Sequence, residues 1–271
     1  MMRAVTAEFT AMFLFVYVCV GCALTTTATA PGASAAAAPL LTISLCFGLT
    51  IFVLAHIFGH VSGAHINPAV TFALIISKQI DVVKGLLYMA AQFLASIIAT
   101  PLLMVTMALK PETLGGYNSL SGPEDNKIFR AFFTEMILTF LLIMTVFATI
   151  DPSRENTAMG PLAIGMAVGV AHLIAVPITG CGINPARSLG PGLFADQEAA
   201  REGLWVFIIA PFVGAAIGAL MYPMWFAEKN FSGGLVSRFH GHEQEENREQ
   251  PKKEKKIFAP DLEAMDLTED C

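Results

Sequence analysis

Long apolar runs separated by short polar segments divide the chain up to Phe226. Each run is about 20 residues long, which is the length that an α-helix needs to cross the hydrocarbon core of a bilayer. The pattern predicts six transmembrane helices, at Ala4–Leu24, Leu40–Phe58, Gly85–Met107, Phe129–Ile150, Pro161–Thr179 and Leu204–Phe226. The sequence therefore predicts an all-α membrane protein.

Two further apolar stretches, Asn67–Ser77 and Asn184–Phe194, are too short to cross a bilayer and are predicted to be re-entrant half-helices. Each begins with the triplet Asn-Pro-Ala, and the six residues concerned are Asn67, Pro68, Ala69, Asn184, Pro185 and Ala186. Asn is a favoured helix N-cap and Pro is favoured at the first helical position. Each triplet therefore predicts the start of a helix.

Three spans and one half-helix form a unit that occurs twice. We assign residues 1–110 to the first repeat, residues 111–128 to an extracellular connecting loop and residues 129–228 to the second repeat. Because three is an odd number, the second repeat must lie inverted in the membrane relative to the first. Helix starts at membrane depth, in matching places of two inverted halves, indicate a binding site or pore at the repeat interface.

The bulk composition agrees with this prediction, since 55% of the 271 residues are hydrophobic and only 14% are charged. Lys and Arg are more frequent in the segments on the side of the two termini, which include Arg3, Lys78 and Lys84. This bias predicts that both termini are cytoplasmic. Residues 229–271 are rich in charge and lack apolar periodicity, and we expect a disordered cytoplasmic tail there.

The sequence contains no recognisable motif of an enzyme active site. The five cysteines have no close spacing of the kind that binds a metal ion. The sequence contains no phosphate-binding loop, nucleotide fingerprint or nucleophile elbow. We therefore expect a protein that is not an enzyme, with no cofactor, no metal ion and no nucleic-acid partner.

The segments Gly59–Val70 and Thr179–Ser188 resemble the two signature loops of the aquaporin, or major intrinsic protein, family. The resemblance extends from about Ala7 to Ala227 and so leaves out only the tail. It implies a channel for water in the lipid bilayer that assembles as a homotetramer with one pore in each subunit. For the cellular location we expect the plasma membrane.

The two half-helix starts have a clear chemical use in such a channel. Their unpaired N–H groups and peptide dipoles oppose a passing cation. The Asn67 and Asn184 amides can donate hydrogen bonds to a passing water molecule from two sides, which disfavours a proton wire. The extended residues before the half-helices are expected to supply carbonyl acceptors along the path, and these residues are Gly63, Ala64, His65, Ile66, Gly180 and Gly182.

A second constriction is expected from the resemblance. Phe47, His172, Cys181 and Arg187 match the narrow aromatic/arginine selectivity filter of water-selective aquaporins. Arg187 is a permanent cation with five N–H donors, and His172 adds a further donor or acceptor. Such donors replace the hydration that a water molecule gives up in a narrow opening.

Glu8 and Glu135 occupy matching places early in the first span of each repeat. One interpretation, which the resemblance implies, is that each carboxylate anchors an inward-folded loop by accepting backbone hydrogen bonds. The other is that both carboxylates carry protons in a proton-coupled carrier.

The expected function is therefore passive, water-selective transport that excludes protons and ions. The alternative is a wider member of the same family that conducts glycerol, hydrogen peroxide or other small neutral solutes. Ser188 and His172 favour water, whereas Ile208 and Gly192 depart from the residues that water-selective relatives tend to carry. We give the filter residues more weight because they contact the permeant.

Overall fold

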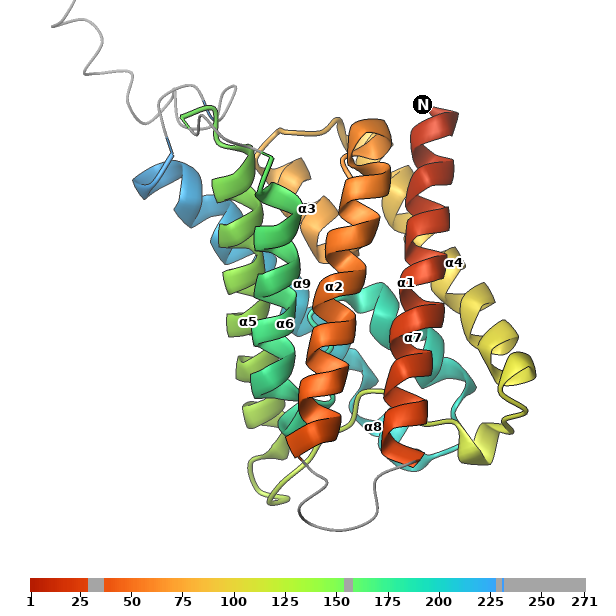
Figure 1. Ribbon diagram of the computed structural model, residues 1–271. Coiled ribbons are helices and arrows are strands. Elements are labelled where there is room, and N and C mark those ends of the chain that lie inside the picture. The colour runs from red at the N-terminus through yellow and green to blue at the C-terminus, as the bar shows by residue number, and fades with distance from the viewer. Residues whose placement is uncertain (29–36, 154–157, 228–230, 232–271) are drawn as a thin grey trace, which may run out of the picture.

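The computed structural model describes residues 1–28, 37–153, 158–227 and 231 of the chain, so the predicted tail lies outside the described residues apart from Phe231. Figure 1 shows a bundle of long helices, and no strand occurs in this described part. The bounds of the long helices are α1 Met2–Ala28, α2 Ala37–Ser62, α4 Val82–Thr106, α5 Lys127–Ile150, α6 Gly160–Thr179 and α9 Leu204–Trp225. The part of the chain described here contains 6 helices long and apolar enough to cross a membrane, which confirms the predicted all-α membrane fold.

The two half-helices begin at the Asn-Pro-Ala triplets. α3 spans Pro68–Ile76 and α7 spans Pro185–Phe194, with Asn67 and Asn184 as their N-caps. At a rise of about 1.5 Å per residue, neither helix covers more than roughly half of a hydrocarbon core of about 30 Å. The remaining short elements are the 3₁₀ turn η2 at Pro111–Thr113 and α8 at Glu198–Glu202, which lie in the connections before α5 and α9.

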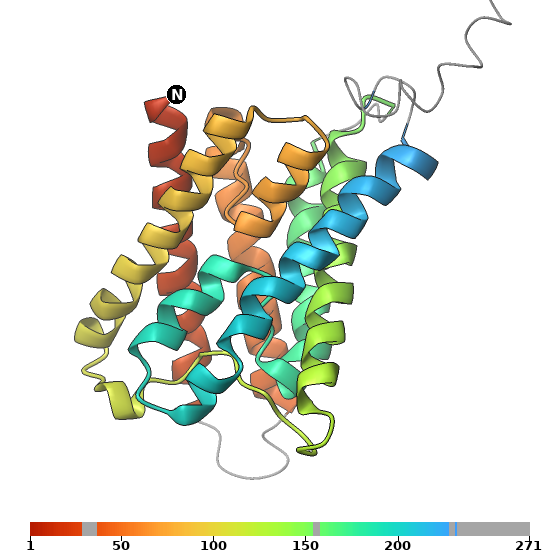
Figure 2. The ribbon, with the colours of Figure 1, turned by 180° about the vertical axis from the view of Figure 1, so that it is seen from behind.

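The half-helices enter the bundle from opposite sides. Figures 1 and 2 show α3 on the side of the N-terminus and α7 on the other side, with their starting ends directed toward the middle of the bundle. Each packs against the third span of the opposite repeat, α3 against α9 and α7 against α4. The two inverted repeats therefore exchange their half-helices across a shared interface.

Small residues allow the two repeats to approach closely between α2 and α6. A Cβ atom added to Gly48 would lie 2.7 Å from the carbonyl oxygen of Gly165, and one added to Gly165 would lie 2.5 Å from the carbonyl oxygen of Gly48. Backbone therefore packs directly on backbone at this crossing. Such close crossings are typical of helices in membranes, where small residues permit van der Waals packing.

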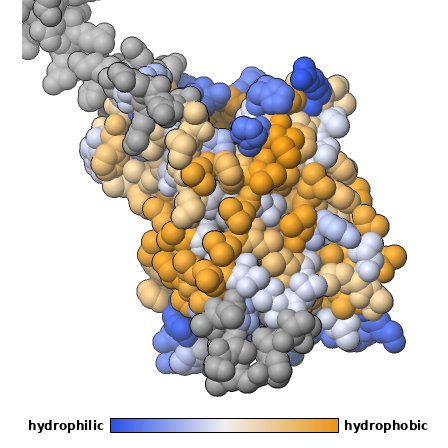
Figure 3. All heavy atoms as spheres, viewed as in Figure 1, coloured by the Kyte–Doolittle hydropathy of each residue, from blue (hydrophilic) through white to orange (hydrophobic). Residues whose placement is uncertain are grey.

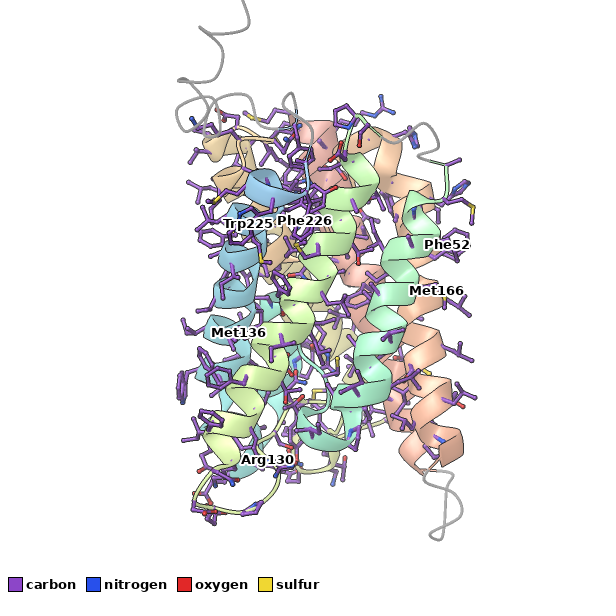
Figure 4. The ribbon with its side chains drawn as sticks, turned by 90° about the vertical axis from the view of Figure 1, so that its left-hand side faces the viewer. Phe52, Arg130, Met136, Met166, Trp225 and Phe226 are labelled. Carbon is purple, nitrogen blue, oxygen red and sulfur yellow. The ribbon has the colours of Figure 1, made fainter. Side chains whose placement is uncertain are left out.

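The outer surface is apolar where lipid would contact it. Figure 3 shows hydrophobic residues across the middle of one face and hydrophilic residues gathered toward its two ends. On α2, every fourth residue of one stripe is about half exposed, and this stripe consists of Leu45, Leu49, Val53 and Ile57. Figure 4 shows Arg130 near one end of the bundle, with Trp225 and Phe226 near the other, as expected for side chains at the rims of a membrane span.

The glycine contact between α2 and α6 generates a prediction about stability. Gly165→Ala places a methyl group against the Gly48 carbonyl, so we expect a destabilisation of about 1–3 kcal/mol from overpacking. The loss is measured as a lower unfolding temperature of the purified protein in detergent.

Gly59→Ala is the matched control, because an added Cβ at Gly59 has no heavy atom within 4 Å. That substitution should leave the unfolding temperature unchanged or raise it slightly, since Ala is favoured over Gly in a helix by roughly 0.5–1 kcal/mol. Equal unfolding temperatures for both variants would contradict direct backbone packing at the crossing.

Candidate functional site

The loops that precede α3 and α7 share an unusual backbone. Three residues in each loop have positive φ angles, namely Gly63 (93°), Ala64 (49°) and Ile66 (53°) in the first and Gly180 (76°), Cys181 (54°) and Ile183 (44°) in the second. Non-glycine residues adopt such angles rarely, at a cost of about 1–3 kcal/mol each, and persist there only when surrounding groups hold them. The identical pattern in both loops means that each repeat needs its own holding group.

Glu8 holds the first loop. Its side chain is fully buried, and Oε1 accepts hydrogen bonds from the hydroxyl of Ser62 at 2.6 Å and from the backbone N–H of His65 at 2.9 Å. Oε2 accepts from the backbone N–H of Ile66 at 2.8 Å and from the Gln92 side-chain amide at 2.8 Å. The carboxylate thus satisfies N–H groups that neither a helix nor a sheet satisfies.

Glu135 holds the second loop in the same way. Its buried carboxylate accepts from the hydroxyl of Thr179 at 2.7 Å and from the backbone N–H groups of Gly182 at 2.8 Å and Ile183 at 2.5 Å. The ion pairs found within the described ranges lie at Lys127 and Arg201 and include neither Glu8 nor Glu135. Both carboxylates are therefore stabilised by neutral donors.

The two N-cap asparagines connect the loops to each other. Asn67 Nδ2 donates to the carbonyl oxygen of Ile183, and Asn184 Nδ2 donates to the carbonyl oxygen of Ile66, both at 2.8 Å. The Oδ1 atom of each asparagine caps its own helix. Asn67 Oδ1 accepts from the backbone N–H of Ala69 at 2.8 Å. Asn184 Oδ1 accepts from the backbone N–H groups of Ala186 at 3.2 Å and Arg187 at 3.3 Å. An amide has two N–H bonds, so each asparagine has a second donor beyond the bond between the loops, and for Asn184 the sulfur of Met12 lies 4.0 Å from the same Nδ2 atom.

A cavity of about 370 Å³ reaches these asparagines. It extends from the turn after α3, at Gln79 and Ile80, to His172 on α6, and Asn67 and Asn184 both line it. Four of the residues expected to supply pore-lining carbonyls also border the cavity, namely Gly63, Ala64, His65 and Gly182. The other two, Ile66 and Gly180, use their carbonyl oxygens to accept from Asn184 and Arg187.

Three of the expected filter residues meet at His172, which lines the cavity, and we call this place the constriction. The ring centroids of Phe47 and His172 are 4.0 Å apart, and the Arg187 guanidinium carbon lies 5.4 Å from the Phe47 ring centroid. Cys181 follows Gly180, whose carbonyl accepts from Arg187 Nη2 at 3.4 Å, so the fourth expected residue borders the same place. All four side chains are buried. The structure thus brings the aromatic rings and the fixed cation together at one constriction.

Two nitrogen atoms at this constriction have no hydrogen-bond partner in the part of the chain that the structure describes. His172 Nδ1 lies 2.8 Å from the carbonyl oxygen of Val168, which requires the proton on Nδ1 and leaves Nε2 as an acceptor. Among the described residues, His172 Nε2 and Arg187 Nε are buried side-chain atoms without a hydrogen-bond partner. One acceptor and one donor are therefore available to a small polar molecule.

The connecting loop before α5 positions Arg187, a role that the sequence reading missed. Arg187 Nη1 donates to the carbonyl oxygen of Gly116 at 2.8 Å and to Asn118 Oδ1 at 3.1 Å. Asn118 Oδ1 also accepts from Ser188 at 2.8 Å, and its amide donates to the Thr179 carbonyl at 3.1 Å. The loop therefore folds into the bundle and fixes the direction of the guanidinium.

These features define a multi-pass membrane channel, built from two inverted repeats around a narrow central path. The chain belongs to the major intrinsic protein family, whose family model matches residues 1–222. Members of this family are channels rather than enzymes, and their permeants are water or small solutes.

The proteins that this chain is similar to agree with the family assignment. The chain is 38% identical over 231 residues to Aquaporin-1 of Bos taurus, with 84% of this chain and 83% of the relative covered. It is 40% identical over 231 residues to Aquaporin-1 of Sus scrofa, with the same coverage. A solved aquaglyceroporin from Plasmodium falciparum matches with a TM-score of 0.68 at 22% identity, over 82% of this chain and 95% of that one. This last likeness shows the fold alone.

The anchoring carboxylates generate a prediction about stability. Glu135→Gln replaces one acceptor oxygen with an N–H₂ group that faces backbone donors, and hydrogen bonds to a charged acceptor contribute about 1.5–3 kcal/mol each. We expect the unfolding temperature to fall by several degrees, measured in detergent by fluorescence or by loss of the monodisperse peak after heating.

Glu124→Gln is the control for charge removal alone. Glu124 is exposed and pairs with Lys127 at 2.8 Å, and surface ion pairs contribute only about 0–1 kcal/mol. If Glu135→Gln unfolds at the same temperature as this control, the second loop does not depend on its carboxylate.

Proposed function

We propose that the chain is a passive channel for water that excludes ions, protons and larger neutral solutes. The observation that supports this proposal most directly is the constriction at Phe47, His172 and Arg187, where one buried acceptor and one buried donor have no partner among the described residues. A water molecule can donate to His172 Nε2 and accept from Arg187 Nε, which replaces part of the hydration that it loses.

The half-helix starts supply the barrier to cations. Each helix N-terminus carries the equivalent of roughly half a positive charge. A cation about 4 Å from either start would be repelled by roughly 2 kcal/mol at an effective dielectric constant of about 20. The two starts together oppose it by roughly 4 kcal/mol, before the cost of dehydration is added. A neutral water molecule does not meet this barrier.

The asparagine pair is the proposed reason that protons do not follow the water. The second N–H of Asn67 and that of Asn184 can donate to one water oxygen from two sides. A water molecule held in this way has its oxygen directed toward the asparagines, so it cannot accept a further proton from a neighbouring water molecule. The chain of hydrogen bonds that proton hopping requires is interrupted at this point.

The two residues that favour a wider pore, Ile208 and Gly192, have no recorded contact with Phe47, His172 or Arg187. Ile208 is on α9 and partly exposed, while a Cβ atom added to Gly192 would meet Leu204 at 2.8 Å. Neither residue lines the cavity that leads to His172. The greater weight given to the filter residues, and so to selectivity for water over glycerol, rests on their mutual contacts and on the two unpartnered nitrogen atoms there.

A proton-coupled carrier finds no support in the surroundings of Glu8 and Glu135. Neither residue lines the cavity, and each accepts hydrogen bonds from the loop that precedes a half-helix. Protonation of either carboxylate would remove acceptors that the backbone needs. We propose that both residues are loop anchors rather than proton carriers.

The proposal also covers the orientation of the channel, its cellular membrane and its oligomeric state. The start of α1 and the end of α9 lie on the same side of the bundle in Figure 1, and Arg3, Lys78 and Lys84 belong to segments on that side. The positive-inside tendency then supports a cytoplasmic position for the start of α1 and the end of α9. A homotetramer in the plasma membrane rests on the family resemblance alone.

Swelling and shrinkage of proteoliposomes in a stopped-flow instrument test the proposed selectivity. The wild-type protein should accelerate water flow at least 10-fold over empty liposomes and should leave glycerol uptake at the level of empty liposomes. His172→Ala removes one ring and one polar wall of the constriction. We expect this variant to take up glycerol at least 10-fold faster while water flow stays within 2-fold, since the asparagine pair is untouched.

His56→Ala is the matched control, because His56 is exposed on the same helix as Phe47 and does not line the cavity. It should behave as the wild type for both solutes. Should the wild-type protein already conduct glycerol as fast as His172→Ala, the constriction is not selective and the wider-pore alternative holds.

A further inference from the structure

The cavity that reaches the two asparagines has an opening on the side of the bundle where α9 ends. We call this opening the mouth, and it is lined by Gln79, Ile80, Lys84, Ile150 and Ile164. Gln79 and Ile150 are exposed, and Lys84 is partly exposed. Figure 2 shows the turn between α3 and α4 on the same side of the bundle as the end of α9. A segment that follows α9 therefore has access to the mouth.

Lys84 brings a positive charge to this mouth without a matching negative charge. Among the described residues that line the cavity there is one lysine, Lys84, and no Asp or Glu. Lys84 Nζ lies 5.5 Å from the centroid of the Tyr88 ring, and the ion pairs found in the described ranges do not include it. Asp81 is close in sequence, but its Oδ1 caps α4 by accepting from the N–H groups of Val83 and Lys84 at 3.0 and 3.2 Å. The ammonium group is therefore available to a carboxylate from elsewhere.

Phe231 fixes the beginning of the C-terminal tail beside the mouth. Its side chain is buried, and its ring centroid lies 5.5 Å from that of Phe147 and 5.2 Å from that of Tyr222. The side-chain amide of Gln79 donates a hydrogen bond to the backbone carbonyl oxygen of Phe231. Because Gln79 also lines the mouth, the chain after Phe231 starts next to the opening.

The sequence after Phe231 contains one segment whose charge complements Lys84. Residues 261–271 include five acidic residues and no lysine or arginine, and the acidic residues are Asp261, Glu263, Asp266, Glu269 and Asp270. Leu262, Met265 and Leu267 stand between them. Residues 248–256, in contrast, include five basic residues and only two acidic ones. The segment 261–271 therefore matches a mouth with one cation among apolar side chains, whereas the basic segment does not.

We propose that residues 261–271 dock at the mouth of their own chain and cover it, with a carboxylate paired to Lys84. Their apolar side chains would then pack against Ile80, Ile150 and Ile164, so that charge and apolar surface are both complementary. The proposal concerns a docking surface and its occupant, and it does not depend on which solute the channel conducts.

The point of attachment at Phe231 favours this occupant over a separate molecule. A linker of about 30 residues with random-coil dimensions spans roughly 30 Å, which is enough to return to a mouth that lies beside its own start. A tethered partner of this kind has an effective concentration of about 1 mM, so even a weak contact is well populated. Salt screens the attraction, because the Debye length falls from about 8 Å at physiological ionic strength to about 3 Å at 1 M.

Cross-linking of the full-length protein in nanodiscs of neutral lipid tests the docking. A short reagent with a maleimide group and a succinimidyl ester joins Cys271, at the end of the acidic segment, to lysines near it. Proteolysis and mass spectrometry then quantify the links to Lys84 and to Lys78, which is exposed in the turn after α3. We expect a link to Lys84 that falls at least 5-fold in 1 M NaCl.

A variant of the tail alone is the matched control, so the folding of the bundle is not at issue. Asp266→Asn, Glu269→Gln and Asp270→Asn together remove three charges and keep the length, the apolar residues and Cys271. Its links to Lys84 should fall at least 5-fold, while links to Lys78 stay within 2-fold. The proposal is overturned if the wild-type protein forms no link to Lys84, or if the link persists unchanged in this variant and in 1 M NaCl.

Water flow measures whether the docked segment covers the path. The neutralised variant should conduct water at least 2-fold faster than the wild type for the same amount of protein in proteoliposomes, and equal rates would overturn the covering. The cross-link is measured without transport, so its loss is a separate result from a failure of the proposed selectivity for water.

Coexpression identifies whose tail occupies the mouth. A Cys271→Ser chain lacks the thiol and a Lys84→Gln chain lacks the amine, so neither can form the link within itself. When the two chains are expressed together, we expect no link between Lys84 and Cys271. A link at the wild-type level would overturn docking within one chain and would show that the tail of a second copy occupies the mouth.

Discussion

Two buried carboxylates support the whole channel, because the bilayer supplies no water to the backbone that the half-helices leave unpaired. Each half-helix begins near the middle of the bundle, and the loop before it has N–H groups that no helix or strand satisfies. Glu8 and Glu135 each accept from two of these N–H groups and from a hydroxyl beside them. Without such acceptors, the strained loops would lose their conformation and the half-helices their position.

The connection between the two half-helix starts follows from the fixed conformation of the two loops. With Ile66 and Ile183 fixed, their carbonyl oxygens are in place to accept from Asn184 and Asn67, so the two half-helix starts are joined at the repeat interface. The second loop also contacts Arg187, whose guanidinium donates to the carbonyl oxygen of Gly180, while the connecting loop before α5 supplies the other two acceptors, at Gly116 and Asn118. The proposed barrier to cations thus depends on one pair of loops, each held by the first span of its own repeat.

Patterns within short segments made most of the fold predictable from the sequence. Apolar run length located the six spans to within a few residues, and the Asn-Pro-Ala triplets located the starts of α3 and α7. Contacts between distant segments were harder to foresee. Nothing near Asn118 indicates that it meets Arg187, since 68 residues separate the two in the printed chain and loop sequences carry no periodicity.

A high-resolution experimental structure in lipid, with ordered water visible along the cavity, tests the central claim most directly. We expect a single file of water in which one molecule lies about 3 Å from Nδ2 of both Asn67 and Asn184, while each Nδ2 keeps its bond to the opposite loop. Further water should lie between His172 Nε2 and Arg187 Nε. A path with no water beside the two asparagines, or with the loops released from Glu8 and Glu135, would contradict it.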